Sequence, residues 1–187
     1  MIRKANLDDA VSIQRLIQVH AEKKQMLFRT LEDISQNIRD FFVFEEEEMV
    51  LGVCALSNSW DKSQMTEEER FKSDHAFDSL VEVRSLAVHP DYLRQGIGTA
   101  LLRHCVEESM MTEKEKIFVL TYAVSLFKKL GFEVIDKSAL PQKIWSDCRG
   151  CSKRDYCDET AMIRSLHPAR SSDHRAEETY THTTRAV

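Results

Sequence analysis

Two glycines in the middle of the chain stand where a predicted strand passes through a turn into a predicted helix. The segment reads Arg94-Gln95-Gly96-Ile97-Gly98-Thr99 and follows the strand-like run 81–88. Glycine lets a ligand approach the backbone, and the first N–H groups of a helix have no intrahelical partner. These donors, the helix dipole and the charge of Arg94 favour an anion such as a pyrophosphate. Tight packing of helix on strand is the structural alternative for such glycines.

This segment matches neither of the two common phosphate-binding loops. No Gly-Lys-Ser/Thr follows at Walker spacing, and position 101 is Leu where the pattern G-x-G-x-x-G requires glycine. The sequence therefore predicts an anion site of another kind.

A second candidate site is the cysteine pattern Cys148-x2-Cys151-x5-Cys157. Three thiolates at this spacing can bind zinc, with Asp158, His167 or water as the fourth ligand. The second C-x2-C pair that would make a zinc site more specific is missing from the sequence. Reduced cysteines that pack a loop and a redox pair are the two other interpretations.

The other two cysteines, Cys54 and Cys105, fall inside apolar patterns and are predicted to be core residues. An odd total of five cysteines and an N-terminus without an apolar signal segment argue against disulfides and secretion. No apolar run reaches the roughly 18–20 residues of a membrane span. The net charge of −5 argues against nucleic acid as the main partner. We expect a cytoplasmic protein without membrane or nucleic-acid partners.

Strand-like and helix-like runs alternate along the chain, which predicts an α/β fold. Apolar runs at 41–44 and 49–56, separated by the acidic residues 45–48, predict a hairpin with a solvated tip. Because of this hairpin we expect a mixed sheet. The other expected strands are 2–5, 81–88, 117–120, 132–135 and 160–166, and the expected helices are 6–24, 31–39, 101–110 and 122–130.

One domain is expected over residues 1–166, with the cysteine segment 148–158 inside it. Residues 58–80 are polar and weakly patterned, and we interpret them as a long insertion or flap. The tail 167–187 contains almost no branched aliphatic residues. It is predicted to be disordered because it buries too little apolar surface to offset its ordering entropy.

The whole string around the glycines resembles the acetyl-CoA-binding motif of the GNAT superfamily of N-acetyltransferases. It reads Leu86-Ala87-Val88-His89-Pro90-Asp91-Tyr92-Leu93-Arg94-Gln95-Gly96-Ile97-Gly98-Thr99-Ala100-Leu101-Leu102, and a second block, Phe127-Lys128-Lys129-Leu130-Gly131-Phe132, is similar to the family's next motif. The resemblance implies the GNAT fold, a mixed and mostly antiparallel sheet flanked by helices.

The resemblance also implies how acetyl-CoA is held. Backbone groups of Leu86, Ala87 and Val88 would pair with the pantetheine arm where the strand splays from its neighbour. The N–H groups of Arg94, Gln95, Gly96, Ile97, Gly98 and Thr99 would hold the pyrophosphate, and Phe127 would also lie against the cosubstrate.

Two positions depart from the family pattern. Leu93 stands where the family usually has Gln or Arg, in a contact made mostly through the backbone. Phe127 stands near the place of a tyrosine that often protonates the leaving thiolate, and Tyr122 lies five residues earlier. The identity of a general acid is left open, since a thiol with a pKa near ~8.5 is a tolerable leaving group.

Further stretches resemble N-acetylglutamate synthases, especially the short single-domain bacterial type. They are 28–34, 37–43, 81–88, 139–145 and the residues around the cysteine segment. This resemblance implies acetyl transfer to the α-amine of L-glutamate, the first committed step of arginine synthesis, within a ternary complex.

Four residues are candidates for this chemistry. Glu82, on the strand beside the cosubstrate motif, is the candidate base, directly or through water, if burial raises its pKa. Two carboxylates of glutamate need at least two cationic or strong donor groups, which Arg29, Arg84 and Lys143 could supply. Strand alternation places Arg84 on the same face as Glu82 and Leu86. A solvent-facing Glu82 and surface ion pairs for the cations are the structural alternatives.

Two other functions stay open at this point. One is a GNAT enzyme that acetylates another amine, namely a protein N-terminus, a lysine or a polyamine. The other is a non-catalytic module that senses acetyl-CoA or metal. A small-molecule amino acid is the expected partner, and a homodimer is compatible with the sequence.

Overall fold

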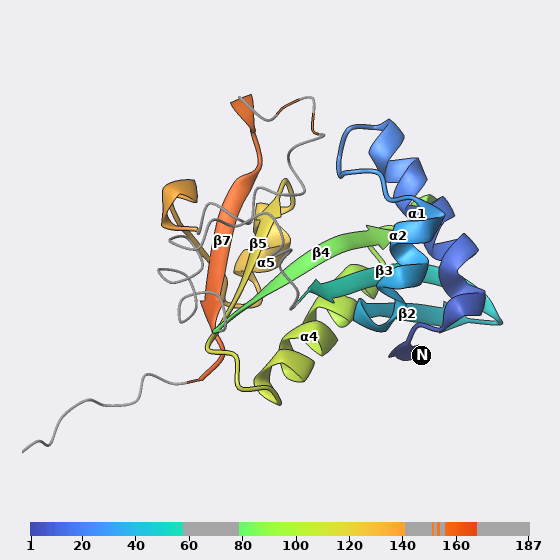
Figure 1. Ribbon diagram of the computed structural model, residues 1–187, viewed down its shortest axis with the longest axis horizontal. Helices are drawn as coiled ribbons and strands as arrows, with labels where there is room; N and C mark the ends of the chain where they lie inside the picture. Colours follow the sequence, from blue (N-terminus) through green and yellow to red (C-terminus); the bar gives the residue numbers. More distant parts are fainter. Residues whose placement is uncertain (58–78, 141–150, 152, 154–155, 168–187) are drawn as a thin grey trace, which may run out of the picture.

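The strands of the structure form one mixed sheet. The computed structural model describes residues 1–57, 79–140, 151, 153 and 156–167, whose strands follow the order β1-β2-β3-β4-β5-β7-β6 (Figure 1). In this sheet β4 and β5 run parallel, and the other neighbouring pairs are antiparallel. The predicted mixed, mostly antiparallel fold is confirmed. The strands are β1 (Ile2–Lys4), β2 (Phe41–Glu46), β3 (Met49–Ser57), β4 (Leu80–Val88), β5 (Lys116–Thr121), β6 (Glu133–Val134) and β7 (Thr160–Ser165).

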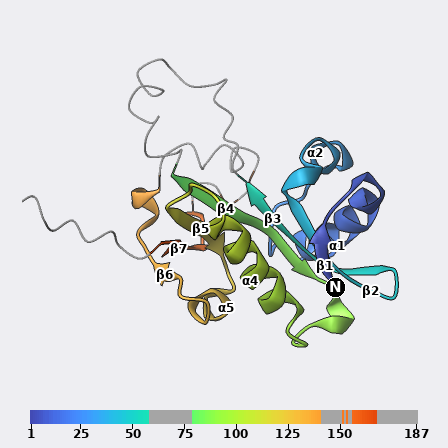
Figure 2. The ribbon, with the colours of Figure 1, turned by 90° about the horizontal axis from the view of Figure 1, so that it is seen from below.

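Helices cover both faces of this sheet (Figure 2). One face carries α1 (Ala10–Glu22) and α2 (Leu31–Gln36), and the other carries α4 (Ile97–Met110) and α5 (Val124–Lys128). Neighbouring residues of β2 therefore enter different cores, because side chains alternate along a strand. Phe42 packs in the cluster that contains Leu101 of α4, and Phe41 packs with residues of α1. Among the described helices none combines the length and apolar character that crossing a bilayer requires.

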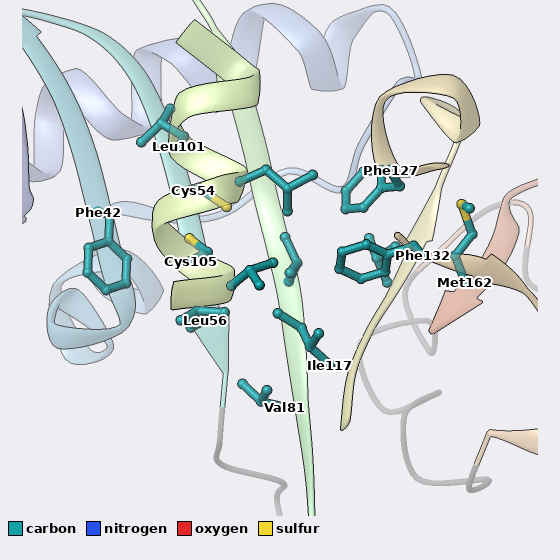
Figure 3. Close-up of a cluster of buried hydrophobic side chains, with 14 of the residues drawn as sticks. Phe42, Cys54, Leu56, Val81, Leu101, Cys105, Ile117, Phe127, Phe132 and Met162 are labelled. Carbon is teal, nitrogen blue, oxygen red and sulfur yellow. The ribbon is translucent and has the colours of Figure 1, made fainter. Parts of the chain in front are cut away.

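The core under α4 contains the two cysteines that were expected there (Figure 3). Cys54 of β3 and Cys105 of α4 are both fully buried and free. The hydrogen bond with the Cys105 thiol, together with burial, raises the pKa of Cys54 well above its ordinary value. Cys54 therefore remains a neutral thiol in the core at physiological pH.

The hairpin between β2 and β3 turns more tightly than its acidic run suggested. Glu45 and Glu46 belong to β2, and the turn consists of Glu47 and Glu48 alone, with φ angles of 49° and 63°. A two-residue turn with both φ angles positive has a backbone twist that matches the right-handed twist of the flanking strands, so it is favoured in hairpins. The expected tip at 45–48 is therefore wrong by two residues.

The predicted helix over 31–39 is interrupted at Asn37. The structure has α2 up to Gln36 and then a 3-10 turn, Ile38–Asp40. The side-chain nitrogen of Asn37 donates to the carbonyl oxygen of Asp33 at 2.9 Å. Asparagine side chains that bond the local backbone compete with helix propagation, which explains the break.

Gly52 of β3 allows α4 to pack closely on the sheet. A Cβ atom at this position would lie 2.8 Å from Cγ2 of Ile97 and 2.9 Å from Cδ1 of Leu101. Ile97 is the first residue of α4, so Gly52 helps to fix where this helix begins.

We expect Gly52→Ala to lower the free energy of unfolding by about 1–3 kcal/mol, because an added methyl group must displace packed side chains. Thermal unfolding of both proteins measures this. Gly98→Ala is the matched control, since its Cβ would meet the nearest atom at an ordinary 3.5 Å. Equal losses in the two variants would contradict the packing argument.

Candidate active site

The parallel strands β4 and β5 separate soon after they begin. Their pairing covers Leu80, Val81 and Glu82 of β4, and beyond this point the two strands diverge (Figure 1). A cavity of about 400 Å³ lies at the divergence. It is lined by His20, Gln25, Met26, Leu27, Arg29, Glu82, Val83, Arg84, Ser85, Leu86, Val119, Leu120, Thr121, Tyr122, Ala123, Phe127 and Glu159. The splay that the resemblance implied is therefore present and opens onto a cavity.

A β-bulge in β4 shapes one wall of this cavity. Arg84 lies opposite Ala55 and Ala87 opposite Val53, so β4 has one more residue than β3 in this interval. Ser85 takes the extra position with a φ angle of 53°, unusual for a residue other than glycine. Non-glycine residues in this conformation cluster at functional sites.

The bulge contradicts one prediction made from the alternation of side chains along this strand, namely that Leu86 shares a face with Glu82 and Arg84. Glu82 and Arg84 share a face as predicted, and their side chains lie 3.8 Å apart. Leu86, however, packs with the cluster that contains Val81 and Val83 on the opposite face. The extra residue at Ser85 shifts the alternation by one position, so the prediction for Leu86 was wrong.

The turn before α4 has the backbone shape of an anion-binding loop. Arg94 and Gly96 have φ angles of 63° and 90°, and Gly96 is the N-cap of α4. The side chains of Arg94 and Gln95 are exposed, whereas Gly98 and Thr99 are half-buried. The N–H groups of the first helical turn point out of the helix beside the end of β4, as a pyrophosphate site requires.

Gly96→Ala should raise the KM for acetyl-CoA about 5- to 30-fold and change kcat little. No heavy atom of the described residues lies within 4 Å of an added Cβ, so the effect is conformational, about 1–2 kcal/mol for a left-handed alanine. Steady-state kinetics with varied acetyl-CoA measure it.

Gly131→Ala is the matched control for Gly96→Ala. Gly131 also has a positive φ, 78°, but it follows α5, outside the predicted anion loop. If this control raised the KM for acetyl-CoA as much, the loop would have no special role in cosubstrate binding.

Glu82 lies where the two strands begin to part, and its residue is 8% exposed. Arg84 also acts electrostatically on half-buried Asp40. Burial raises the pKa of Asp40, and the charge of Arg84 opposes that rise. Arg29, in the connection between α1 and α2, contacts Asp33 at 3.3 Å and has a side chain that is 15% exposed. The cavity therefore joins one candidate base with two guanidinium groups.

Phe127 lines the cavity but belongs equally to the core. It is 1% exposed and packs edge to face on Phe132, with ring centroids 5.2 Å apart. It has no ionisable group, as the sequence already indicated.

Tyr122, which follows β5, is the tyrosine that lines the cavity wall. Its hydroxyl donates to Asp158 at 2.5 Å and accepts from Nζ of Lys153 at 3.1 Å. Burial and the hydrogen bond to Asp158 raise the pKa of Tyr122, while Lys153 opposes the rise. The hydrogen bonds from Tyr122 and Lys153 lower the pKa of Asp158 to about 2. These bonds fasten the segment before β7 to the cavity wall.

Lys143 and Cys148 fall outside the described residues, so their predicted roles are not tested by the structure. Cys151 and Cys157 are half-buried. The described part of the chain contains no group of three His, Cys, Asp or Glu side chains that could hold a metal. Zinc therefore gains no support from these residues.

Three residues of the cavity carry no signal in the sequence that would mark them as part of a site. His20 falls within the apolar pattern of the first helix, which gives no sign that its ring reaches β4. Glu159 lies two residues after Cys157 and lines the cavity, and burial raises its pKa. Ser85 has no sequence signal for its left-handed backbone.

Comparison with known proteins identifies the class that this fold and site define. The family model described as an acetyltransferase (GNAT) domain matches residues 37–134. An uncharacterized N-acetyltransferase of Chlorobaculum tepidum is 37% identical over 167 residues, which cover 88% of this chain and 96% of that protein. The chain belongs to the GNAT family of N-acetyltransferases.

More distant similarities lie among proteins named for amino-acid acetylation. The amino-acid acetyltransferase of Vibrio atlanticus is 27% identical over 76% of this chain, which spans only 28% of that longer protein. The structure of N-acetylglutamate synthase from Neisseria gonorrhoeae, complexed with coenzyme A and N-acetylglutamate, matches with a TM-score of 0.72 at 23% identity. That match covers 90% of this chain and 35% of the other chain. At this identity the structural match shows the shared fold.

Proposed function

We propose that this protein transfers the acetyl group of acetyl-CoA to the α-amine of an amino acid, and that L-glutamate is its acceptor. The observation that carries the proposal is the cavity at the strand splay, which brings Glu82 together with Arg29 and Arg84. The names of the distant relatives and the resemblance of the C-terminal block support the same acceptor class. The reaction would then serve as the first step of arginine synthesis.

Two parts of the chain are assigned to acetyl-CoA. The N–H groups of residues 94–99 bind the pyrophosphate, because they are oriented donors at a helix N-terminus. The pantetheine arm pairs with Leu86 to Val88 on the edge of β4 that β5 has left. This pairing directs the thioester into the cavity.

Glu82 is assigned the role of base. An amino acid arrives with a protonated amine, and Glu82 takes one proton, directly or through water. The amine then attacks the thioester carbonyl carbon, the carbon–sulfur bond breaks, and CoA leaves as a thiolate that takes up a proton. The bulge at Ser85 lines the same cavity. A bulge leaves a residue outside the regular ladder, and a backbone N–H there is assigned the role of stabilising the developing oxyanion.

Arg29 and Arg84 are assigned to the carboxylates of the acceptor. A guanidinium binds a carboxylate through two parallel hydrogen bonds, which suits a diacid. Both arginines are held in place by acidic neighbours, Asp33 and Glu82 respectively.

A panel of amino acids with acetyl-CoA, followed by release of free CoA, tests the proposal. We expect L-glutamate to give the highest kcat/KM and the product to carry its acetyl group on the α-nitrogen. Turnover of a lysine peptide, a protein N-terminus or a polyamine without turnover of any amino acid would contradict it. Tight binding of acetyl-CoA without turnover of any amine would indicate a sensor.

A further inference from the structure

His20 joins two walls of the cavity that come from distant parts of the chain. It lies in the last turn of α1, and its Nε2 is 2.8 Å from the carbonyl oxygen of Val88 in β4. Because a carbonyl oxygen only accepts, Nε2 must carry the proton of this hydrogen bond. The other ring nitrogen, Nδ1, lies 3.1 Å from the side-chain oxygen of Gln25. With the proton on Nε2, Nδ1 is an acceptor, so these two side chains form a hydrogen bond when the Gln25 amide is turned to present its nitrogen.

The carbonyl of Val88 faces the side of β4 that β5 has left. The next residue, His89, donates its N–H to the carbonyl oxygen of Leu51, which belongs to β3. In a trans peptide the carbonyl and the following N–H point in opposite directions, so the Val88 oxygen points away from β3. His20 therefore holds the open edge of β4, the edge assigned to the pantetheine arm.

Residues 23–30, here named the acceptor loop, form the wall on the other side of His20. Its second residue, Lys24, has a φ angle of 57°, and the loop includes the cavity-lining residues Gln25 and Arg29. Gln25 is fastened to His20 twice, through its side chain and through its backbone N–H, which donates to the His20 carbonyl at 3.1 Å. The loop is thus tied to β4 through one imidazole ring.

We propose that His20 is a positioning residue that couples the cosubstrate edge of β4 to the acceptor loop. The role of the loop in acceptor binding rests on the proposed function, whereas the coupling itself needs only CoA. Among the described residues, no strand pairs with the β5 side of β4 past Glu82. A ligand that pairs there restricts the strand end, and the His20 bond passes this restriction to Gln25 and the loop. Binding of CoA therefore prepares the loop that carries Arg29.

Amide hydrogen exchange of the full chain, with and without saturating CoA, tests this proposal. In the unmodified protein we expect peptides that cover residues 23–30 to exchange at least about fivefold more slowly when CoA is bound, the lower end of common coupling factors. His20→Phe keeps an aromatic ring but loses both hydrogen bonds, so CoA should then change loop exchange less than twofold. His20→Gln should retain most of the effect, because its Nε2 can still donate to Val88.

Two further variants and a matched CoA concentration separate loss of the His20 link from a general loss of folding or of CoA binding. Gln25→Ala removes only the loop side of the link and should also weaken the CoA effect, even if His20→Phe does not fold. His104→Phe changes a histidine of α4 that packs on Phe42 and does not line the cavity, and it should leave the effect intact. Each variant is measured at a CoA concentration that saturates it.

The proposal is overturned if CoA leaves loop exchange unchanged or faster in the unmodified protein, or if the same slowing persists in His20→Phe. With an accepted amino acid, His20→Phe should also raise the acceptor KM about fivefold or more, while the KM for acetyl-CoA stays within about twofold. Failure of the proposed function appears differently, as absence of turnover with every amino acid, and does not alter the exchange result.

Discussion

Glu82→Gln is expected to lower kcat by about 10²- to 10⁴-fold, the usual contribution of a positioned base. The substitution keeps the size of the side chain but removes its ability to accept a proton from the acceptor amine. Residual activity should rise with pH, because more of the acceptor is then already deprotonated in solution. Steady-state rates over a range of pH, at saturating concentrations of both substrates, measure this effect.

Loss of the ion pair with Arg84 is the competing explanation for a defect in Glu82→Gln. Thermal unfolding therefore accompanies the kinetics, and Glu133→Gln, at an exposed position of β6, is the control for the same change in another strand. A decrease of less than about tenfold in kcat would show that the proton is accepted elsewhere.

Arg29→Ala should raise the KM for L-glutamate about 10- to 150-fold. A hydrogen bond to a charged group contributes about 1.5–3 kcal/mol, and each 1.4 kcal/mol is a factor of ten in affinity. The KM for acetyl-CoA should stay similar, because Arg29 lines the cavity whereas residues 94–99 of the predicted pyrophosphate loop do not. Kinetics with each substrate varied in turn separate the two effects.

Arg15→Ala provides the control for Arg29→Ala, since Arg15 is exposed on α1 and does not line the cavity. Arg29→Lys should lie between the two, because lysine keeps the charge but loses the bidentate geometry. Equal increases of both Michaelis constants in Arg29→Ala would contradict the assignment of Arg29 to the acceptor.

The fold could be predicted from sequence because its signals are local and repetitive. The apolar runs at 41–44 and 49–56, and the pattern from Leu101 to Met110, fall on strands and a helix of the structure. The GNAT motif around Gly96 and Gly98 placed the helix N-terminus at the end of β4. These features depend on neighbouring residues, which a sequence displays directly.

The shape of the cavity depends on features that local patterns do not encode. Nothing in the residue type of Ser85 indicates its positive φ angle, and this bulge moved Leu86 to the other face. The His20 bond to Val88 spans 68 positions of sequence. Helical periodicity could place His20 on a face of α1, but only the packing of α1 on the sheet brings its ring to β4.

The central claim is that the amides of residues 94–99 hold the pyrophosphate of CoA and thereby direct its thiol toward Glu82. A crystal structure of this protein with bound CoA tests it most directly. We predict the pyrophosphate against the N-terminus of α4, with the pantetheine arm along Leu86 to Val88. A nucleotide bound elsewhere, with this loop and the open edge of β4 empty, would contradict the assignment of the site.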